Sequence, residues 1–243
     1  ARTKQRVLLI DTDPQGHVAV ALGMDKAPGI RSLIDRAAQD NPASLPIVIT
    51  PARENLDTIL SDATTRHAKR TLAAMDFRET VLKKTIAEVG HLYDIAVIDC
   101  APSADVLHIS ALVAATDIII PTRLDHLAVD GVNEVLRTIV AIRDSLGGTG
   151  LNVRGIVPTF YERRTKETPL QLKALVEAFE RLVMPPIPTD VKLRECPAFG
   201  QPIWEYAATT NAIVGVPVNS ANPKGKRFGG YIALAELVED WLR

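Results

Sequence analysis

One stretch decides the fold: Arg6-Val7-Leu8-Leu9-Ile10-Asp11-Thr12-Asp13-Pro14-Gln15-Gly16. Its aliphatic run stops at two carboxylates and a turn, a pattern typical of a parallel-sheet strand covered on both faces. Ligands in open α/β sheets bind at the carboxyl ends of such strands. Asp11 and Asp13 lie two residues apart on an extended chain and point the same way, which suits a metal ion and a polarised water. A plainer interpretation stays open, because Asp followed by Pro is also a common turn signal after a strand.

A second stretch repeats the pattern: Tyr93-Asp94-Ile95-Ala96-Val97-Ile98-Asp99-Cys100-Ala101-Pro102-Ser103. An aliphatic run again ends at an Asp, here Asp99, and breaks at a Pro. Because neighbouring parallel strands bring their carboxyl ends to one edge of a sheet, we expect Asp11, Asp13 and Asp99 to converge. Three carboxylates repel one another unless a cation lies between them, and Mg²⁺ is usually held by one or two carboxylates plus substrate phosphates. The sequence therefore predicts a nucleotide site.

Composition narrows the class of protein. The chain has 243 residues, 47% hydrophobic and 23% charged, which is typical of a soluble globular protein. Its formal net charge of −1 excludes a uniformly basic surface. No apolar run approaches the roughly 20 residues that span a bilayer, and no signal peptide opens the chain. Cys100 and Cys196 form no metal-binding pair in sequence. We expect a cytoplasmic protein that does not bind membranes.

The whole chain alternates between strand and helix patterns. This alternation predicts an α/β fold with a doubly wound, mostly parallel sheet, in a single domain over residues 1–243. We expect short strands at 45–49 and 56–60, longer strands at 93–100, 117–121 and 151–161, and helices at 65–89, 103–115, 129–146, 172–183 and 231–242. We expect a short strand near Ile187 after the Pro185-Pro186 break, and then an irregular segment to residue 222 with Trp204 and Tyr206 in its core.

Both stretches resemble signatures of the ParA-type partition ATPases, the deviant Walker group of P-loop proteins that includes MinD. Residues 7–16 are similar to the second signature of the family, and residues 93–103 to its Walker B strand. Residues 114–122 resemble the strand that follows, and residues 159–165 a later strand end. The resemblance extends over essentially the whole chain and implies a P-loop NTPase-like fold.

The sequence departs from the family at its beginning. The family opens with a strand and the loop Lys-Gly-Gly-x-Gly-Lys-Thr-Thr, whose amides and lysine hold the phosphates. Residues 1–243 contain no such loop, and residues 1–4 resemble the end of a helix. We therefore expect a longer protein that here lacks its first strand, its phosphate loop and most of its first helix, and negligible ATP hydrolysis by these residues alone. The alternative is a noncatalytic ParA-like paralogue that acts only as a protein-interaction scaffold.

The resemblance also implies site residues and cofactors. Asp13 would be catalytic and would orient the attacking water, and Asp11 and Asp99 would hold Mg²⁺. The nucleotide, ATP, would contact Asp13, Pro102, Thr159 and Pro217. Catalysis in such a site is mainly positioning and charge neutralisation.

The partners implied by the resemblance are a second subunit, DNA and a ParB-like centromere-binding protein. ATP would join two subunits into a homodimer that binds DNA nonspecifically at the nucleoid, and the partner would stimulate hydrolysis. We expect Lys224, Lys226 and Arg227 to contact DNA phosphates. A solvated turn and DNA contacts by Arg163 and Arg164 stay open as alternatives, as does the choice between plasmid and chromosome.

Two related functions fit less well. A MinD-like membrane cycler needs a basic amphipathic carboxyl terminus, whereas Glu236, Glu239 and Asp240 make this one acidic. A relative of the nitrogenase iron protein needs several cysteines for its cluster, and this chain has two, far apart.

Overall fold

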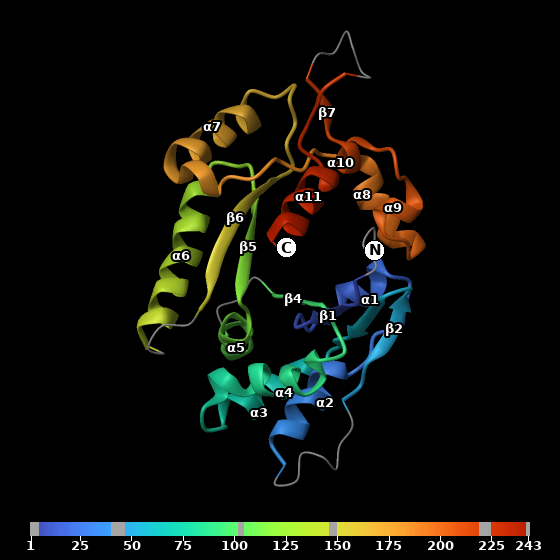
Figure 1. Ribbon diagram of the computed structural model, residues 1–243, viewed down its shortest axis with the longest axis vertical. Helices are drawn as coiled ribbons and strands as arrows, with labels where there is room; N and C mark the ends of the chain where they lie inside the picture. The colour runs from blue at the N-terminus through green and yellow to red at the C-terminus, as the bar shows by residue number, and fades with distance from the viewer. Residues whose placement is uncertain (1–4, 40–46, 102–104, 146–149, 219–224, 242–243) are drawn as a thin grey trace. The chain divides into compact units, whose positions relative to one another are not determined.

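The computed structural model describes residues 5–39, 47–101, 105–145, 150–218 and 225–241 (Figure 1). The chain forms two compact units, Ala1–Thr116 (unit 1) and Asp117–Arg243 (unit 2). This division does not test the expected single domain over 1–243, which stays a prediction.

Unit 1 is built on a four-stranded sheet in the order β2-β3-β1-β4. Its strands are β1 (Val7–Asp11), β2 (Thr50–Arg53), β3 (Leu56–Ile59) and β4 (Ile95–Asp99). Strand β1 pairs in parallel with both β3 and β4, and β2 is an antiparallel edge strand. The prediction of a strand at 45–49 was wrong in position: the strand lies at β2, and residues 40–46 are outside the described residues. Strand β2 includes Pro51, whose missing N–H is tolerated at a sheet edge.

Helices pack against this sheet around one core. They are α1 (His17–Ala21), α2 (Gly29–Ala37), α3 (Thr65–Ala73), the 3₁₀ helix η2 (Arg78–Thr80), α4 (Val81–Gly90) and α5 (Val106–Ala114). Leu8 and Ile10 of β1 are fully buried against Leu33, Leu72 and Leu82 of α2, α3 and α4. Each such side chain contributes roughly 1.5–3 kcal/mol of burial free energy. Strand β1 therefore runs through this core, and its last residue, Asp11, is fully buried.

The prediction of one long helix over 65–89 was wrong. Helix α3 ends at Ala73, and Phe77 has a left-handed φ of 53°, a conformation that interrupts a helix. The chain restarts as α4, where the amide of Leu82 donates to Ser110 Oγ at 3.2 Å. Both halves supply Leu side chains to the same core, so hydrophobic spacing alone did not reveal the break.

Unit 2 contains a parallel pair, β5 (Asp117–Arg123) and β6 (Asn152–Thr159), joined by α6 (Ala128–Ser145). Side chains along β5 alternate between exposed and buried, so one face of this strand is covered. A short antiparallel hairpin is formed by β7 (Val216–Pro217) and β8 (Arg227–Phe228). The remaining elements are α7 (Glu167–Phe179), η3 (Glu180–Leu182), α8 (Val191–Glu195), η4 (Cys196–Phe199), α9 (Ile203–Tyr206), α10 (Asn211–Val214) and α11 (Tyr231–Trp241).

The predicted fold class is confirmed, because helices alternate with strands and β1, β3, β4, β5 and β6 all pair in parallel. The helix predicted at 172–183 is present as α7, whereas the segment after Ile187, up to residue 222, was predicted to be irregular and instead contains the short helices α8, α9 and α10. Trp204 was expected in the core and is instead 57% exposed, whereas Tyr206 is partly buried and stacks on Phe199 at 5.2 Å. None of the described helices is long and apolar enough to cross a membrane.

Candidate functional site

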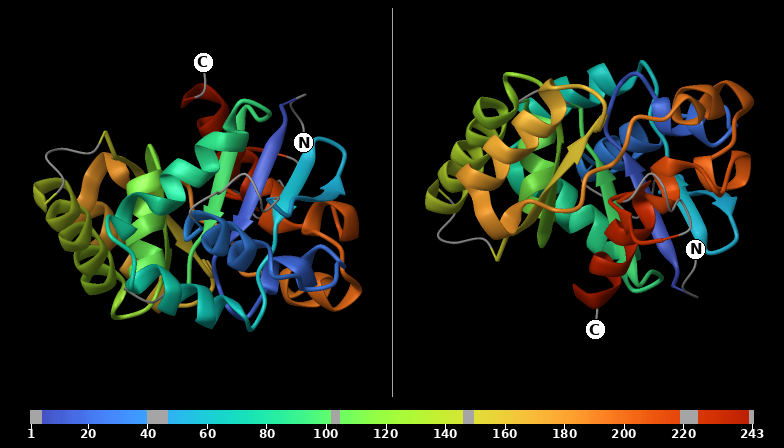
Figure 2. Two further views of the ribbon diagram at one scale, coloured as in Figure 1. Left: turned by 90° about the horizontal axis from the view of Figure 1, so that it is seen from below. Right: turned by 90° about the horizontal axis from the view of Figure 1, so that it is seen from above.

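The register of two strands brings two of the predicted carboxylates together. Strands β1 and β4 lie side by side (Figure 2), and their pairing places Asp11 opposite Asp99. Thr12, the next residue, donates from its amide to the Asp99 carbonyl oxygen at 3.0 Å and from its hydroxyl at 2.8 Å. In-register neighbours on parallel strands point to the same face of the sheet. The two carboxylates are therefore neighbours on one face, at the carboxyl end of both strands.

Asp11 is fully buried at this edge. Its Oδ1 accepts the Asp13 amide at 2.9 Å, and its Oδ2 accepts the Val18 amide at 3.4 Å. Burial is the main reason that the pKa of Asp11 is raised to about 6; the charge of Asp99 raises it further, and the two amides oppose the shift. Asp11 therefore connects the end of β1 to the start of α1, which has no side-chain cap of its own.

Asp13 lies in the turn that follows, and its side chain is partly buried. Its Oδ1 accepts the Gln15 amide at 2.8 Å, and its carbonyl oxygen accepts the Gly16 amide at 3.0 Å. Gly16 has a φ of +62°, and a Cβ there would lie 2.5 Å from the Ser61 carbonyl oxygen, so only glycine fits this turn. The turn gives Asp13 a defined position beside the two strand ends.

The carboxylates interact electrostatically. Asp99 is exposed, but partial desolvation of its carboxylate at the strand end raises its pKa, and the charge of Asp13 raises it further. Within the described ranges, no group of three His, Cys, Asp or Glu side chains is arranged to hold a metal ion. A Mg²⁺ ion completed by phosphate oxygens and water needs only one or two carboxylates. Asp11 and Asp99, which lie opposite each other and of which Asp99 raises the pKa of Asp11, fit such an ion.

A pocket of about 180 Å³ lies in unit 2 beside the hairpin. Its lining residues are Tyr161, Arg163, Val216, Pro217, Val218 and Phe228. Arg163 donates from Nη1 to the carbonyl oxygens of Pro217 at 2.8 Å and Val218 at 2.9 Å. This contact holds β7 against the segment that follows β6, and it makes one wall of the pocket.

The other predicted nucleotide contacts are only partly described. Pro217 lines the unit 2 pocket. Thr159 ends β6, where its hydroxyl donates to the Thr122 carbonyl oxygen at 3.1 Å. Pro102 lies outside the described residues. Sequence reasoning missed that Arg163 anchors the Pro217 backbone, since nothing in a run of basic residues distinguishes an anchor from a ligand.

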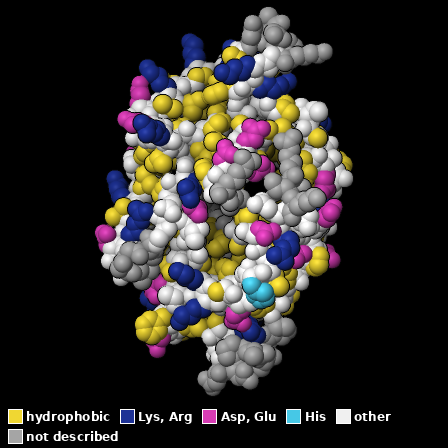
Figure 3. Space-filling view, viewed as in Figure 1, with side chains coloured by type: hydrophobic (Ala, Val, Ile, Leu, Met, Phe, Trp, Pro, Cys, Tyr) yellow, Lys and Arg dark blue, Asp and Glu magenta, His cyan; other side chains and the backbone are white. Residues whose placement is uncertain are grey.

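The residues predicted to contact DNA have different environments. Lys224 lies outside the described residues, and Lys226 is exposed. Arg227 donates from Nη1 to the Gly215 carbonyl oxygen at 2.7 Å and to Asn211 Oδ1 at 3.5 Å, so it also stabilises the hairpin. Arg164 is exposed. On the face shown in Figure 3, Lys and Arg side chains lie among Asp and Glu side chains and do not merge into one basic surface.

Comparisons with known proteins identify the family. A family model described as an AAA domain matches residues 1–151. The chromosome-partitioning ATPase Soj of Treponema pallidum is 33% identical over 205 residues, which are 84% of this chain and 79% of that protein. Over the matched length, the chain is therefore related to partition ATPases in sequence as well as in fold.

Solved structures show the same fold. Apo McdA from Cyanothece has a TM-score of 0.75 at 20% identity, covering 96% of this chain and 88% of that one. Cobyrinic acid a,c-diamide synthase from Mycobacterium smegmatis, solved with ADP and magnesium, has a TM-score of 0.66 at 29% identity, covering 84% of this chain and 80% of that one. Together with the matched family model and the Soj relative, these likenesses establish that the chain belongs to the family of ParA-type partition ATPases.

Proposed function

We propose that the complete protein is a ParA-like ATPase that acts in plasmid or chromosome partitioning, with ATP and Mg²⁺ as cofactors. The observation that carries this proposal is the pairing of Asp11 with Asp99 at the carboxyl ends of adjacent parallel strands, with Asp13 in the glycine-dependent turn that follows. Nucleotides bind at this edge of open α/β sheets.

The three carboxylates would have different roles in ATP hydrolysis. Asp13, which is less buried than Asp11, would orient the attacking water. Asp11 and Asp99 would hold Mg²⁺, and Asp11 would also keep the Asp13 turn in place through its bond to the Asp13 amide. Bound Mg²⁺ would supply charge neutralisation for the phosphates. The structural neighbour that was solved with ADP and magnesium supports this choice of ligands.

As the family resemblance implies, Pro217 would contact the nucleotide. Pro217 lines the unit 2 pocket together with Tyr161 and Phe228. Arg163 would act by fixing the backbone of the pocket wall. Thr159 would contribute from the end of β6.

The open edge of β4 supports a further strand in the complete protein. Among the described strands, β4 pairs with β1 alone, and its Val97 is 47% exposed. An unpaired edge of this kind accepts another strand through its free backbone groups. A strand that leads into a phosphate-binding loop would pair there.

The remaining parts of the proposal concern partners. ATP would join two subunits into a homodimer, the dimer would bind DNA without sequence preference at the nucleoid in the cytoplasm, and a ParB-like centromere-binding protein would stimulate hydrolysis. The relationship to Soj, a chromosome-partitioning ATPase, supports this cycle.

The test is ATP binding and turnover by the complete natural gene product, including any residues that precede Ala1. Asp13→Asn keeps an oxygen that accepts the Gln15 amide but removes the charge, whereas Asp13→Ala removes both. We expect both variants to lower Mg²⁺-dependent turnover by about 10²–10⁴-fold, the usual contribution of a positioned acid or base, and to retain ATP affinity.

The matched control is Asp25→Ala, which removes an exposed carboxylate from the same region of the chain. It should leave turnover unchanged. Loss of ATP binding together with turnover in Asp13→Asn would make Asp13 structural. A wild-type protein that binds no ATP would replace this proposal with the noncatalytic scaffold.

A further inference from the structure

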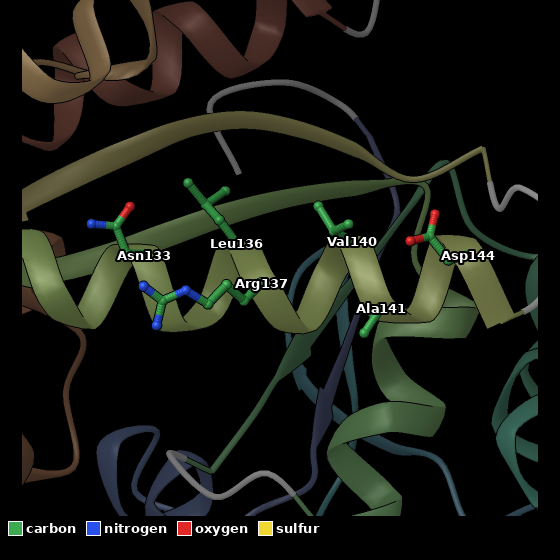
Figure 4. A pocket seen from close by; sticks show the side chains of 6 residues that line it. All are labelled: Asn133, Leu136, Arg137, Val140, Ala141 and Asp144. Atoms are coloured by element: carbon green, nitrogen blue, oxygen red, sulfur yellow. The ribbon is translucent and has the colours of Figure 1, made fainter.

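One side of α6 carries a stripe of residues of which Arg137, Val140, Ala141 and Asp144 are exposed. Its members, spaced three or four residues apart, line a shallow groove of about 390 Å³ (Figure 4): Asn133, Leu136, Arg137, Val140, Ala141 and Asp144. We call this set the α6 stripe. Residues with this spacing share one face of a helix.

The α6 stripe differs from the side of α6 that forms the core. The core side carries Ala128, Val132, Ile139 and Ile142, all buried. Val140, near the middle of the stripe, is 52% exposed. On the side of α6 opposite the core, Val140 and Ala141 thus form a small apolar centre between the charged side chains of Arg137 and Asp144.

Two opposite charges flank the apolar centre. Arg137 and Asp144 are seven residues apart, about 10 Å along the helix, which is too far for them to pair with each other. Neither forms an ion pair or a hydrogen bond with any described residue. Both charges are thus available to a partner.

The positions of Arg137 and Asp144 along α6 match those of a second, antiparallel copy of the same helix. Arg137 and Asp144 are equally distant from the midpoint between Val140 and Ala141. If a second α6 lies antiparallel about a two-fold axis at that midpoint, Arg137 faces Asp144 of the other copy, Asp144 faces Arg137, and Val140 faces the small side chain of Ala141. A parallel copy would instead set Arg against Arg. We propose that the α6 stripe is a self-complementary contact between two copies of this chain.

This contact is small. Helix α6 has 18 residues, about 27 Å, so one helix pair buries less than the roughly 1,200 Å² of a stable complex. The association is therefore weak, and it needs no nucleotide. This contact does not depend on the ATP-dependent dimer proposed above, so either association can be tested without the other.

Charge reversal tests the contact in the nucleotide-free full-length protein by sedimentation velocity. Arg137→Asp makes the stripe wholly acidic, and Asp144→Arg makes it wholly basic. We expect each variant alone to associate at least tenfold more weakly than the wild type. A one-to-one mixture of the two should associate again, because both cross-pairs then become Asp with Arg. The double variant Arg137→Asp/Asp144→Arg should recover for the same reason.

The matched control is Arg66→Asp on α3, the same charge change at another exposed site, which should associate as the wild type does. Two misfolded variants would not associate when mixed. Recovery in the mixture therefore separates a loss of the contact from a loss of folding. A wild type that stays monomeric at every concentration overturns the proposal. So do single variants that associate normally, or a mixture that fails to recover.

Discussion

The carboxylate of Asp11 is buried, and this burial makes the stability of the folded protein depend on pH in a measurable way. Its pKa is raised to about 6 in the folded state, mainly by burial, from 3.8 in an unstructured chain. The folded protein therefore binds the Asp11 proton more tightly than the unfolded chain does. This contribution to stability is fully present below about pH 4 and is lost as the pH rises through about 6. The loss amounts to at most about 3 kcal/mol at 1.36 kcal/mol per pKa unit.

Asp11→Asn removes this pH-dependent loss and keeps an oxygen that accepts the Asp13 amide. We expect the free energy of unfolding of the variant, relative to wild type, to increase by up to about 3 kcal/mol between pH 4 and pH 7. Urea unfolding at several pH values measures it. Asp76→Asn, at an exposed carboxylate, should follow the wild-type pH dependence. Parallel curves for wild type and Asp11→Asn would show that Asp11 titrates normally.

Some residues of the site could be predicted from the sequence, and others could not. Asp11 and Asp99 could be predicted because each ends an apolar run, and the pairing of the two strands then brings them together. The hydrogen bonds by which Arg163 and Arg227 hold the hairpin could not be predicted, because their partners are backbone carbonyl oxygens more than ten residues away in sequence. Contacts to backbone leave no side-chain pattern to detect.

At the scale of helices and strands, the junction between α3 and α4 depends on one hydroxyl. Ser110 on α5 is fully buried, and its Oγ accepts the Leu82 amide near the start of α4. Amides in the first turn of a helix have no partner within it. Ser110→Ala leaves the Leu82 amide buried and unpaired, so we expect a loss of about 1–3 kcal/mol in the free energy of unfolding.

Chemical denaturation of Ser110→Ala measures this loss. Ser145→Ala, at an exposed serine that ends α6, serves as the control and should differ little from wild type. A Ser110→Ala variant as stable as the wild type would mean that another acceptor takes the Leu82 amide.

The break before α4 also explains why the long helix was mispredicted. The apolar spacing over 65–89 is helical on both sides of Phe77. The left-handed turn at Phe77 lets η2 and α4 pack against α5, and local helix propensity does not encode that packing. In contrast, β5 and β6 were predictable, since each is a run of mostly aliphatic residues of strand length.

At the scale of the whole molecule, a net charge of −1 means that the proposed DNA binding would depend on local basic groups. Lys226 is exposed and close to the hairpin, whereas Arg227 is also a hairpin anchor, so reversing Arg227 would mix folding with binding. We expect Lys226→Ala to weaken ATP-dependent DNA binding and to reduce the salt slope by about 0.9 for each DNA phosphate that is no longer neutralised, or about twice that in a dimer.

Affinity for duplex DNA measured against salt concentration tests this prediction. Lys83→Ala, an exposed lysine on α4, is the control and should leave the slope unchanged. An unchanged salt slope in Lys226→Ala would show that Lys226 does not contact DNA phosphates. A reduced slope in Arg164→Ala would then assign the contact to the segment that follows β6.

The pairing of Asp11 with Asp99 also limits how the chain tolerates changes in length. Side chains alternate between the two faces of a strand, so deleting one residue within β4 ahead of Asp99 would turn Asp99 to the opposite face while Asp11 stayed in place. Adding one residue within β1 would separate the pair in the same way. Insertions and deletions that preserve the site are therefore confined to the connections between elements, and the two strands can diverge in sequence but not in length.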